Sequence, residues 1–211
     1  MDIVLFGMQG SGKGTQSQKI AAQFGLKIFE TGAELRRLAE ENSELGKKVK
    51  SIMTAGHLVP TEVVMEIIED FAKQLPDGSG ALFDGIPRSD DQRKQFDELM
   101  NKTGREFKGL LIEISEEEAL KRLTTRRICD ACKNAYPSFY DKEVCENCGG
   151  KLVTRQDDTP DAIRVRLDTF LEKTIPVIEH YKKQGKMITI RGEQSIAGVE
   201  KDILEALNSL M

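Results

Sequence analysis

Short apolar runs alternate with longer mixed segments along most of this chain. The apolar runs are continuous, and they predict β-strands at residues 3–6, 27–29, 81–83, 110–114 and 187–190. The segments between them predict helices at residues 13–24, 34–41, 45–55, 61–75, 89–100, 116–125, 160–184 and 195–210. Continuous apolar strands are typical of a parallel sheet that helices cover on both faces. The pattern therefore predicts an α/β fold with a doubly wound, five-stranded parallel sheet.

Two regions interrupt the alternation of strands and helices. Residues 30–59 are predicted to be entirely helical, and residues 125–158 contain all four cysteines and two of the three tyrosines. The remaining segments, 1–29, 60–124 and 159–211, follow the alternating pattern. We therefore predict one core domain made of three segments, with a helical insertion and a separate cysteine-bearing module.

Several predicted helices begin with recognisable signals. Ser89 and Ser115 are each followed three residues later by Gln or Glu, which is the capping-box pattern. Thr159 followed by Pro160 is typical of an N-cap and the first helical residue.

Composition narrows the class of protein. The 211 residues are 39% hydrophobic and 31% charged, which indicates a globular chain with a sizeable core. The net charge of −4 argues against general nucleic-acid binding. No apolar stretch approaches the ~18 residues of a membrane span, and the first seven residues lack the features of a signal peptide. We expect a cytoplasmic enzyme without nucleic-acid or membrane partners, for which a monomer suffices.

The cysteines form two C-x2-C pairs, Cys129 with Cys132 and Cys145 with Cys148, which twelve residues separate. Two such pairs supply four soft ligands for a tetrahedral metal, most often zinc. Redox-active dithiols and unrelated buried thiols are the alternatives, and the doubled pair favours the metal. Because four protein ligands leave no open position, we expect a structural zinc that allows a short module to fold.

A glycine-rich loop joins the first predicted strand to the first predicted helix. Residues 7–15 read GMQGSGKGT, in which backbone N–H groups can surround phosphate oxygens and Lys13 can reach the β- and γ-phosphates. Gly14 stands where the strict pattern has Ser or Thr, so Thr15 is a doubtful direct metal ligand. An ordinary glycine turn with a solvated lysine is the alternative. A dinucleotide site is rejected because the loop has no G-x-G-x-x-G.

This loop and several later segments resemble those of the adenylate kinase family. The matching segments are GKGTQ at 12–16, TG at 31–32, GHLVP at 56–60, DGIPR at 84–88 and RQDD at 155–158. They occur in the family's order and span the chain. The cysteines match the bacterial branch whose long lid carries a zinc ribbon. The resemblance implies magnesium-dependent transfer of the γ-phosphoryl group of ATP to AMP, giving two ADP.

The resemblance also implies an AMP-binding role for the helical insertion and a water-excluding lid for the cysteine module. It implies that ATP is bound by Gly10, Ser11, Gly12, Lys13, Gly14, Thr15, Arg122 and Arg126, with further contacts from Tyr136 and Gln194. It implies that AMP is bound by Thr31, Arg36, His57, Leu58, Val59, Gly85, Arg88, Gln92, Arg155 and Arg166. The catalytic group that it implies is Lys13, Asp84, Arg88, Arg126, Arg155 and Arg166. Arginine suits this chemistry, because its planar guanidinium binds phosphate bidentately and stays charged.

Several of these residues also have plainer interpretations. Asp84 either orders the water shell of magnesium or forms the turn before Gly85. Gln92 either completes a capping box or also reads the adenine of AMP. Tyr136 either contacts adenosine or belongs to the ribbon core. The histidines, His57 included, have no visible partner pattern and read as structural or exposed.

The charged residues near the predicted lid leave similar choices. Asp157 and Asp158 either act in lid closure, pair with arginines or are solvated. Three further arginines are interpreted as surface charges, namely Arg93, Arg127 and Arg164.

Three departures from the family pattern are visible. Gln9 stands where the family often has proline, and Ala33 stands where a T-G-D motif would place aspartate. These two changes affect loop stiffness and the monophosphate pocket. The segment between the cysteine pairs is also short, which affects the lid's contacts with the triphosphate.

Two other functions are alternatives to phosphoryl transfer from ATP to AMP. The nearest is another nucleoside monophosphate kinase, and a more distant one is a zinc-ribbon module that binds nucleic acid. A GTPase switch would need D-x-x-G after the third strand and a later N-K-x-D, and neither is present.

Overall fold

The computed structural model describes residues 1–137 and 139–209, so Ser138, Leu210 and Met211 lie outside the described part. Its centre is a five-stranded sheet, ordered β2–β3–β1–β4–β8, in which every neighbouring pair is parallel. The strands are β1 (Asp2–Phe6), β2 (Lys27–Glu30), β3 (Ala81–Asp84), β4 (Phe107–Glu113) and β8 (Met187–Arg191). The predicted parallel α/β fold is confirmed.

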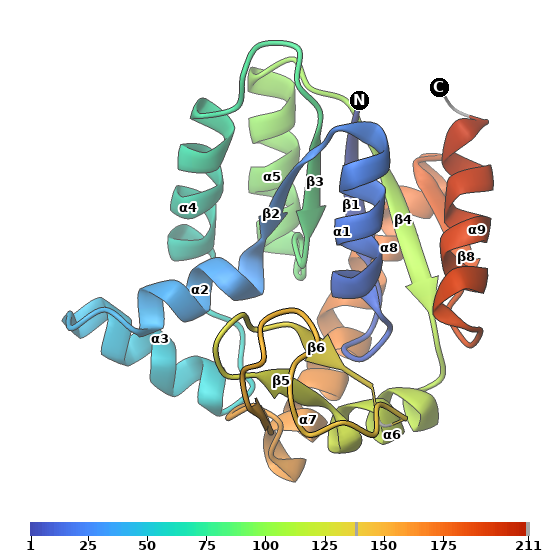
Figure 1. Cartoon of the computed structure of the whole chain (residues 1–211). Helices are drawn as coiled ribbons and strands as arrows, with labels where there is room; N and C mark the ends of the chain where they lie inside the picture. The colour runs from blue at the N-terminus through green and yellow to red at the C-terminus, as the bar shows by residue number, and fades with distance from the viewer. Residues whose placement is uncertain (138, 210–211) are drawn as a thin grey trace.

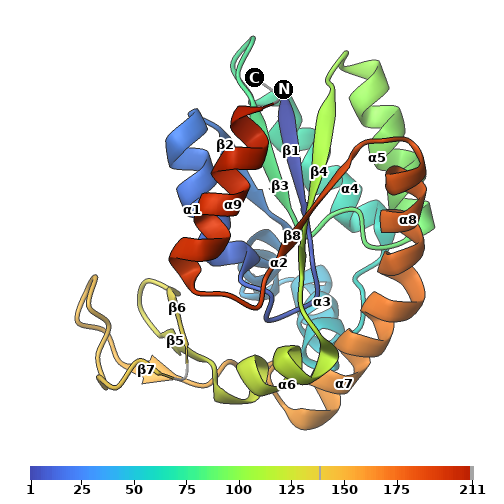
Figure 2. The ribbon, with the colours of Figure 1, turned by 90° about the vertical axis from the view of Figure 1, so that its right-hand side faces the viewer.

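Helices cover both faces of this sheet because its strands are apolar on both sides (Figure 2). Ile3 and Leu5 face a cluster that includes Ile20 of α1 (Lys13–Phe24) and Ile203 of α9 (Ile196–Asn208). The alternate residues Val4 and Phe6 belong to the opposite cluster. That second face is covered by α4 (Thr61–Lys73), α5 (Asp90–Lys102) and α8 (Ile175–Lys183).

Residues after β2 form two helices, α2 (Thr31–Ala39) and α3 (Glu44–Thr54), which project to one side of the sheet (Figure 1). Ser43 caps α3, because its hydroxyl accepts the N–H of Gly46. The helix predicted at 34–41 begins earlier, directly after β2.

A second, three-stranded antiparallel sheet lies beyond the carboxyl edge of the central sheet (Figures 1 and 2). Its order is β6–β5–β7, with β5 (Arg127–Cys129), β6 (Ala135–Tyr136) and β7 (Leu152–Val153). It is connected to the core through α6 (Glu116–Thr125) on one side and α7 (Pro160–Thr169) on the other. The cysteine-bearing segment is therefore attached at two places only.

The prediction of one regular helix over 160–184 is wrong in the middle of that range. A π-helical turn, η1 (Phe170–Thr174), separates α7 from α8, and Ile175 donates its N–H to Phe170 O. Pro176 lacks an N–H and its ring would clash with a carbonyl of a regular α-helix, so a widened turn accommodates it. At the end of the chain, α9 stops at Asn208, and Leu210 lies outside the described residues.

Only half of each predicted capping box forms. Ser89 and Ser115 accept the expected backbone N–H groups. The return bonds are absent, because Gln92 Oε1 accepts the N–H of Arg88 at 2.8 Å and Glu118 instead pairs with Arg122. Gln92 thus holds the loop before the helix.

None of the described helices is both long enough and apolar enough to cross a lipid bilayer.

Candidate active site

The glycine-rich loop lies between β1 and α1, at the carboxyl edge of the central sheet. Gly7, Gly10 and Gly12 have positive φ angles of 150°, 83° and 95°, which other residues adopt only with strain. No side chain caps α1, and its first turn has no acidic residue. Five other helices are capped by a hydroxyl, from Ser43, Ser89, Ser115, Thr159 and Ser195. The N-terminus of α1 therefore keeps free N–H donors and its positive dipole end for an anion.

Lys13 turns back over this loop. Its ammonium donates to Gly7 O at 2.6 Å and to Met8 O at 3.1 Å. Burial lowers the pKa of Lys13 to about 8, although the charge of Asp84 opposes this shift. The loop thus holds a cation in a site that disfavours its charge, which an anionic ligand would relieve.

Asp84 ends β3 beside Lys13, and the segment after it turns sharply. Burial raises the pKa of Asp84, while Lys13 and Arg88 act in the opposite direction. Gly85 has a φ of +86°, and a Cβ there would lie 2.6 Å from Arg88 Nη2. Arg88 donates from Nε to Gly85 O at 2.7 Å, and burial lowers its pKa. Lys13, Gly85 and Arg88 line one small cavity at the sheet edge.

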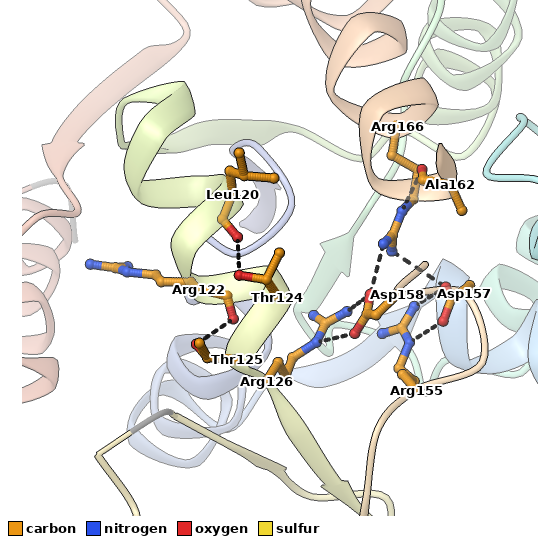
Figure 3. A network of polar contacts seen from close by, with 10 residues as sticks. All are labelled: Leu120, Arg122, Thr124, Thr125, Arg126, Arg155, Asp157, Asp158, Ala162 and Arg166. Carbon is orange, nitrogen blue, oxygen red and sulfur yellow. Dashed lines mark hydrogen bonds and ion pairs between the residues drawn. The ribbon is translucent and has the colours of Figure 1, made fainter. Parts of the chain in front are cut away.

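Three arginines converge on two carboxylates where the cysteine-bearing segment joins α6 and α7 (Figure 3). Arg126 donates from Nε and Nη2 to the two oxygens of Asp158 at 2.9 and 2.7 Å, and Arg166 shares Asp158 Oδ1 at 2.7 Å. Arg155 forms a bidentate pair with Asp157, which Arg166 also contacts at 3.4 Å. The side chain of Asp158 is completely buried.

Electrostatics explains how this cluster holds together. Burial raises the pKa of Asp157, but the hydrogen bond from Arg155 and the charges of Arg155 and Arg166 hold it at about 2. Burial, and then the charge of Arg155, lowers the pKa of Arg126. Three guanidinium groups face two carboxylates, so the cluster keeps an excess of positive charge for a further anion.

Two predicted AMP-binding residues lie on α2, directly after β2, which pairs with the strand that ends at Asp84. Thr31 is buried, and its hydroxyl has no hydrogen-bond partner within the described chain. Arg36 lies against Gly32, where a Cβ would be 3.2 Å from its Nη1. Burial, and then Arg155, lowers the pKa of Arg36 to about 10, so this arginine stays charged near neutral pH.

The remaining AMP residues differ in exposure. Val59 is buried, Leu58 is half-buried and His57 is exposed. Gln92 is buried with its Oε1 on Arg88, and no acceptor among residues 1–137 and 139–209 bonds its Nε2. The oxygen of Gln92 thus orients the loop, and its amide N–H₂ stays open to a ligand.

Three further predicted ATP-binding residues differ in their contacts, namely Arg122, Gln194 and Tyr136. Arg122 pairs with Glu118 and donates to Gly10 O at 3.5 Å and Gly192 O at 3.1 Å. Gln194 is exposed and donates to Arg191 O and Asp202. Tyr136 is buried with Cys129 and Cys145 in the small sheet, which supports its interpretation as ribbon core.

The arginines interpreted as surface charges serve local contacts. Arg93 pairs with Asp90 and Asp97. Arg127 donates to Tyr140 O, and Arg164 is exposed.

The four cysteine sulfurs lie within 4.8 Å of one another. Cys129 Sγ is 3.5 Å from Cys148 Sγ, and Cys132 Sγ is 3.4 Å from Cys145 Sγ. Zinc–sulfur bonds of ~2.3 Å in a tetrahedron place sulfurs roughly 3.8 Å apart, so the cluster has the size that zinc requires. The Tyr136 hydroxyl lies 3.0 Å from Cys145 Sγ and supplies a donor to that sulfur.

The sequence as a whole matches a known family. The family model described as adenylate kinase matches residues 5–186. The chain belongs to the adenylate kinase family. A curated adenylate kinase of Kosmotoga olearia is 37% identical, and the match covers 100% of both chains. One of Caldicellulosiruptor saccharolyticus is 37% identical over 98% of this chain and 99% of its own. One of Staphylococcus aureus is 35% identical over 100% of both.

Adenylate kinases are ATP:AMP phosphotransferases that use magnesium with ATP, and this adenylate kinase is an enzyme of that class. The family expected from the sequence motifs is therefore confirmed. Nucleic-acid binding by a zinc ribbon is not favoured.

Two site residues were missed by the sequence reasoning. Phe170 and Thr174 line the cavity that also contains Lys13 and Arg88. They were assigned to a regular helix, and Pro176 was the one local signal of an irregular turn in it.

Proposed function

We propose that this adenylate kinase transfers the γ-phosphoryl group directly from ATP to AMP in the space between the glycine-rich loop and the arginine cluster. One observation carries the proposal. An uncapped helix N-terminus with a buried lysine faces arginines that arrive from several separate segments. Such a site neutralises and positions two polyanions, which is what phosphoryl transfer requires.

The donor nucleotide is held by the loop. The N–H groups of Gly10 to Thr15 surround the phosphates of ATP, and Lys13 leaves its carbonyl partners to bind the β- and γ-oxygens. Arg122 and Arg126 add charge from the lid side. Gln194 lies on the surface beside this site and binds the adenosine of ATP through its exposed amide.

The acceptor is held across Asp84. Arg36 and Arg88 bind the phosphate of AMP, each beside a glycine that leaves room for its guanidinium. The unpartnered Thr31 hydroxyl and the free Nε2 of Gln92 supply polar contacts for adenine. Leu58 and Val59 supply the apolar wall, and exposed His57 lies at its rim.

Asp84 fits a role in holding the water shell of magnesium. No donor in the described part of the chain bonds its carboxylate, although burial raises its pKa. An orphaned carboxylate at a strand end suits the waters that Mg²⁺ retains. The ion would neutralise charge that develops on the transferring group. Lys13, Arg126, Arg155 and Arg166 act with it on the same oxygens.

We propose three parts for the chain, with 1–29, 60–124 and 159–211 as the core, 30–59 as the AMP-binding insertion and 125–158 as the lid. Zinc bound by Cys129, Cys132, Cys145 and Cys148 stiffens the lid, and motion occurs at its two attachments. Closure expels water, which would otherwise hydrolyse ATP. Asp157 and Asp158 hold the lid arginines in position while phosphates are absent.

We also propose that the enzyme acts as a monomer in the cytoplasm on small nucleotides. The acidic net charge of −4 supports the absence of a nucleic-acid partner.

The acceptor is tested by a coupled assay of ADP formation from ATP with AMP, GMP, CMP or UMP. We expect a kcat/KM for AMP at least about a hundredfold above the others, because a buried polar pocket rejects a mismatched base. A preference for GMP, CMP or UMP would instead assign the chain to another class of monophosphate kinase.

A further inference from the structure

A hydroxyl on the π-helical turn contacts the segment that carries Arg88. Thr174 Oγ1 donates to Arg88 O at 2.9 Å, across 86 positions of sequence. Thr174 is 5% exposed, so solvent scarcely competes for this bond. The bond connects η1 directly to the loop between β3 and α5.

Four other threonines within helices or at their ends behave differently. The hydroxyls of Thr103, Thr124, Thr125 and Thr169 each bond a carbonyl four residues earlier in their own helix. That bond is the usual outcome for threonine inside a helix. The widened turn instead directs the hydroxyl of Thr174 outward to a separate segment. π-Turns of this kind are frequent at functional sites.

Arg88 is thereby held on both sides of its Cα. Its carbonyl accepts the hydroxyl of Thr174, and its N–H donates to Gln92 Oε1 at 2.8 Å. Its Nε donates to Gly85 O at 2.7 Å. Two helices therefore determine the direction in which this backbone presents the guanidinium.

We propose that Thr174 is a positioning residue for Arg88 and that the π-turn exists to bring its hydroxyl to that carbonyl. This rests on the proposed role of Arg88 in binding the phosphate of AMP. On this proposal Thr174 acts on the acceptor phosphate through Arg88. Loss of its hydroxyl leaves a part-buried carbonyl without its protein partner, and the loop then relaxes to satisfy it elsewhere.

The test compares Thr174→Val, which keeps the branched shape without the donor, with Thr174→Ser, which keeps the donor. Thr169→Val is the matched control, because its hydroxyl bonds only Val165 O in the same helix. Binding of AMP and of ATP is measured by titration calorimetry without turnover, along with the melting temperature. We expect Thr174→Val to weaken AMP binding roughly tenfold and ATP binding less than twofold. Thr174→Ser should restore most of the AMP affinity.

A double-mutant cycle separates this inference from the proposed function. With Arg88→Ala as the background, Thr174→Val should cause no further loss of AMP affinity. If Arg88→Ala alone leaves AMP binding intact, the proposed role of Arg88 is wrong. If Arg88→Ala weakens AMP binding but Thr174→Val does not, or weakens both nucleotides equally, the positioning role is wrong. Should Thr174→Val fail to fold, Thr174→Cys takes its place, and unchanged AMP binding in that variant overturns the proposal.

Discussion

At the scale of single residues, the site depends on charged side chains that are buried, where little solvent stabilises their charge. Lys13 is the clearest case, because burial lowers its pKa to about 8 while its partners are two backbone carbonyls. A triphosphate that replaces those carbonyls stabilises the charged form. Binding of ATP and protonation of Lys13 are therefore coupled.

This coupling predicts a pH dependence of ATP binding. Because ATP binds the protonated lysine, its affinity should fall as pH rises through about 8, by about tenfold per pH unit above that value. Lys13→Met should bind ATP weakly and without this dependence between pH ~7 and ~9. Titration calorimetry at several pH values measures both. A wild-type affinity that stays constant to pH ~9 would contradict the assignment.

The lowered pKa of Lys13 also affects the stability of the folded state. Folding lowers the pKa of Lys13, so its charge destabilises the folded state fully below pH 8, and the penalty disappears as pH rises toward the ordinary 10.5. Lys13→Met should therefore melt higher than the wild type at neutral pH, by roughly 5 °C after allowance for partial exposure. In thermal melts, the difference in melting temperature between Lys13→Met and the wild type should vanish as the pH approaches the ordinary pKa of lysine.

Gly85 offers a test of steric space beside Arg88. Gly85 has a φ of +86° and Gly78 a φ of +74°, but only at Gly85 would a Cβ meet a side chain within 3 Å. Both Gly→Ala changes should cost about 1–2 kcal/mol of backbone strain. Only Gly85→Ala should also raise KM for AMP, by about tenfold or more, since Arg88 must move. Equal KM values in the two variants would show that Arg88 tolerates the displacement.

At the scale of elements, the cysteine-bearing sheet has too few apolar residues to hold itself together. Its buried cluster contains only Cys129, Tyr136, Cys145 and Leu152 among the described residues. A Cβ at Gly150 would lie 2.7 Å from Cys129 Sγ, so the turn after the second pair brings backbone against sulfur. Four sulfurs at this spacing are compatible with a zinc site, whose metal–thiolate bonds would replace a core.

Replacing Cys129 and Cys145 with serine should therefore affect stability before it affects chemistry. We expect loss of bound zinc and a melting temperature lower by roughly 10 °C, with turnover at low temperature reduced less than about threefold. Metal analysis, thermal melts and the coupled assay measure the three quantities. An unchanged melting temperature would mean that the metal does not hold the lid.

At the scale of the whole molecule, the arginine cluster exists only because distant segments meet. Arg126 follows α6, Arg155 follows β7 and Arg166 lies on α7. Asp157 and Asp158 join all three (Figure 3). These ion pairs connect the two ends of the cysteine-bearing segment to α7.

Removal of one carboxylate tests whether these ion pairs hold the three segments together. Asp158→Asn leaves two buried guanidinium groups sharing a neutral partner, and should destabilise the protein by about 3 kcal/mol. Asp70→Asn is the matched control, because its pair with Lys73 is exposed and should be worth less than about 0.5 kcal/mol. A bisubstrate dinucleoside polyphosphate should raise the melting temperature of Asp158→Asn more than that of the wild type. An equal rise in both would show that the phosphates do not meet these arginines.

The five-stranded parallel sheet, the glycine-rich loop and the four-cysteine cluster could all be predicted from the sequence. Each depends on neighbours within a few residues: a continuous apolar run, a glycine pattern before a helix, or two close cysteine pairs. The family resemblance named the arginines, but no local pattern showed which of them would meet a carboxylate. The folded chain was needed to show that Gln92 holds Arg88 instead of closing a capping box, and that Thr174 lies on a π-turn against the same residue. The contact of Thr174 depends on how the helices pack on the sheet, because a hydroxyl and a backbone carbonyl 86 positions apart meet only after the core has formed. Gln92 lies only four positions from Arg88, but the capping-box pattern does not distinguish the N–H of Arg88 from that of Ser89.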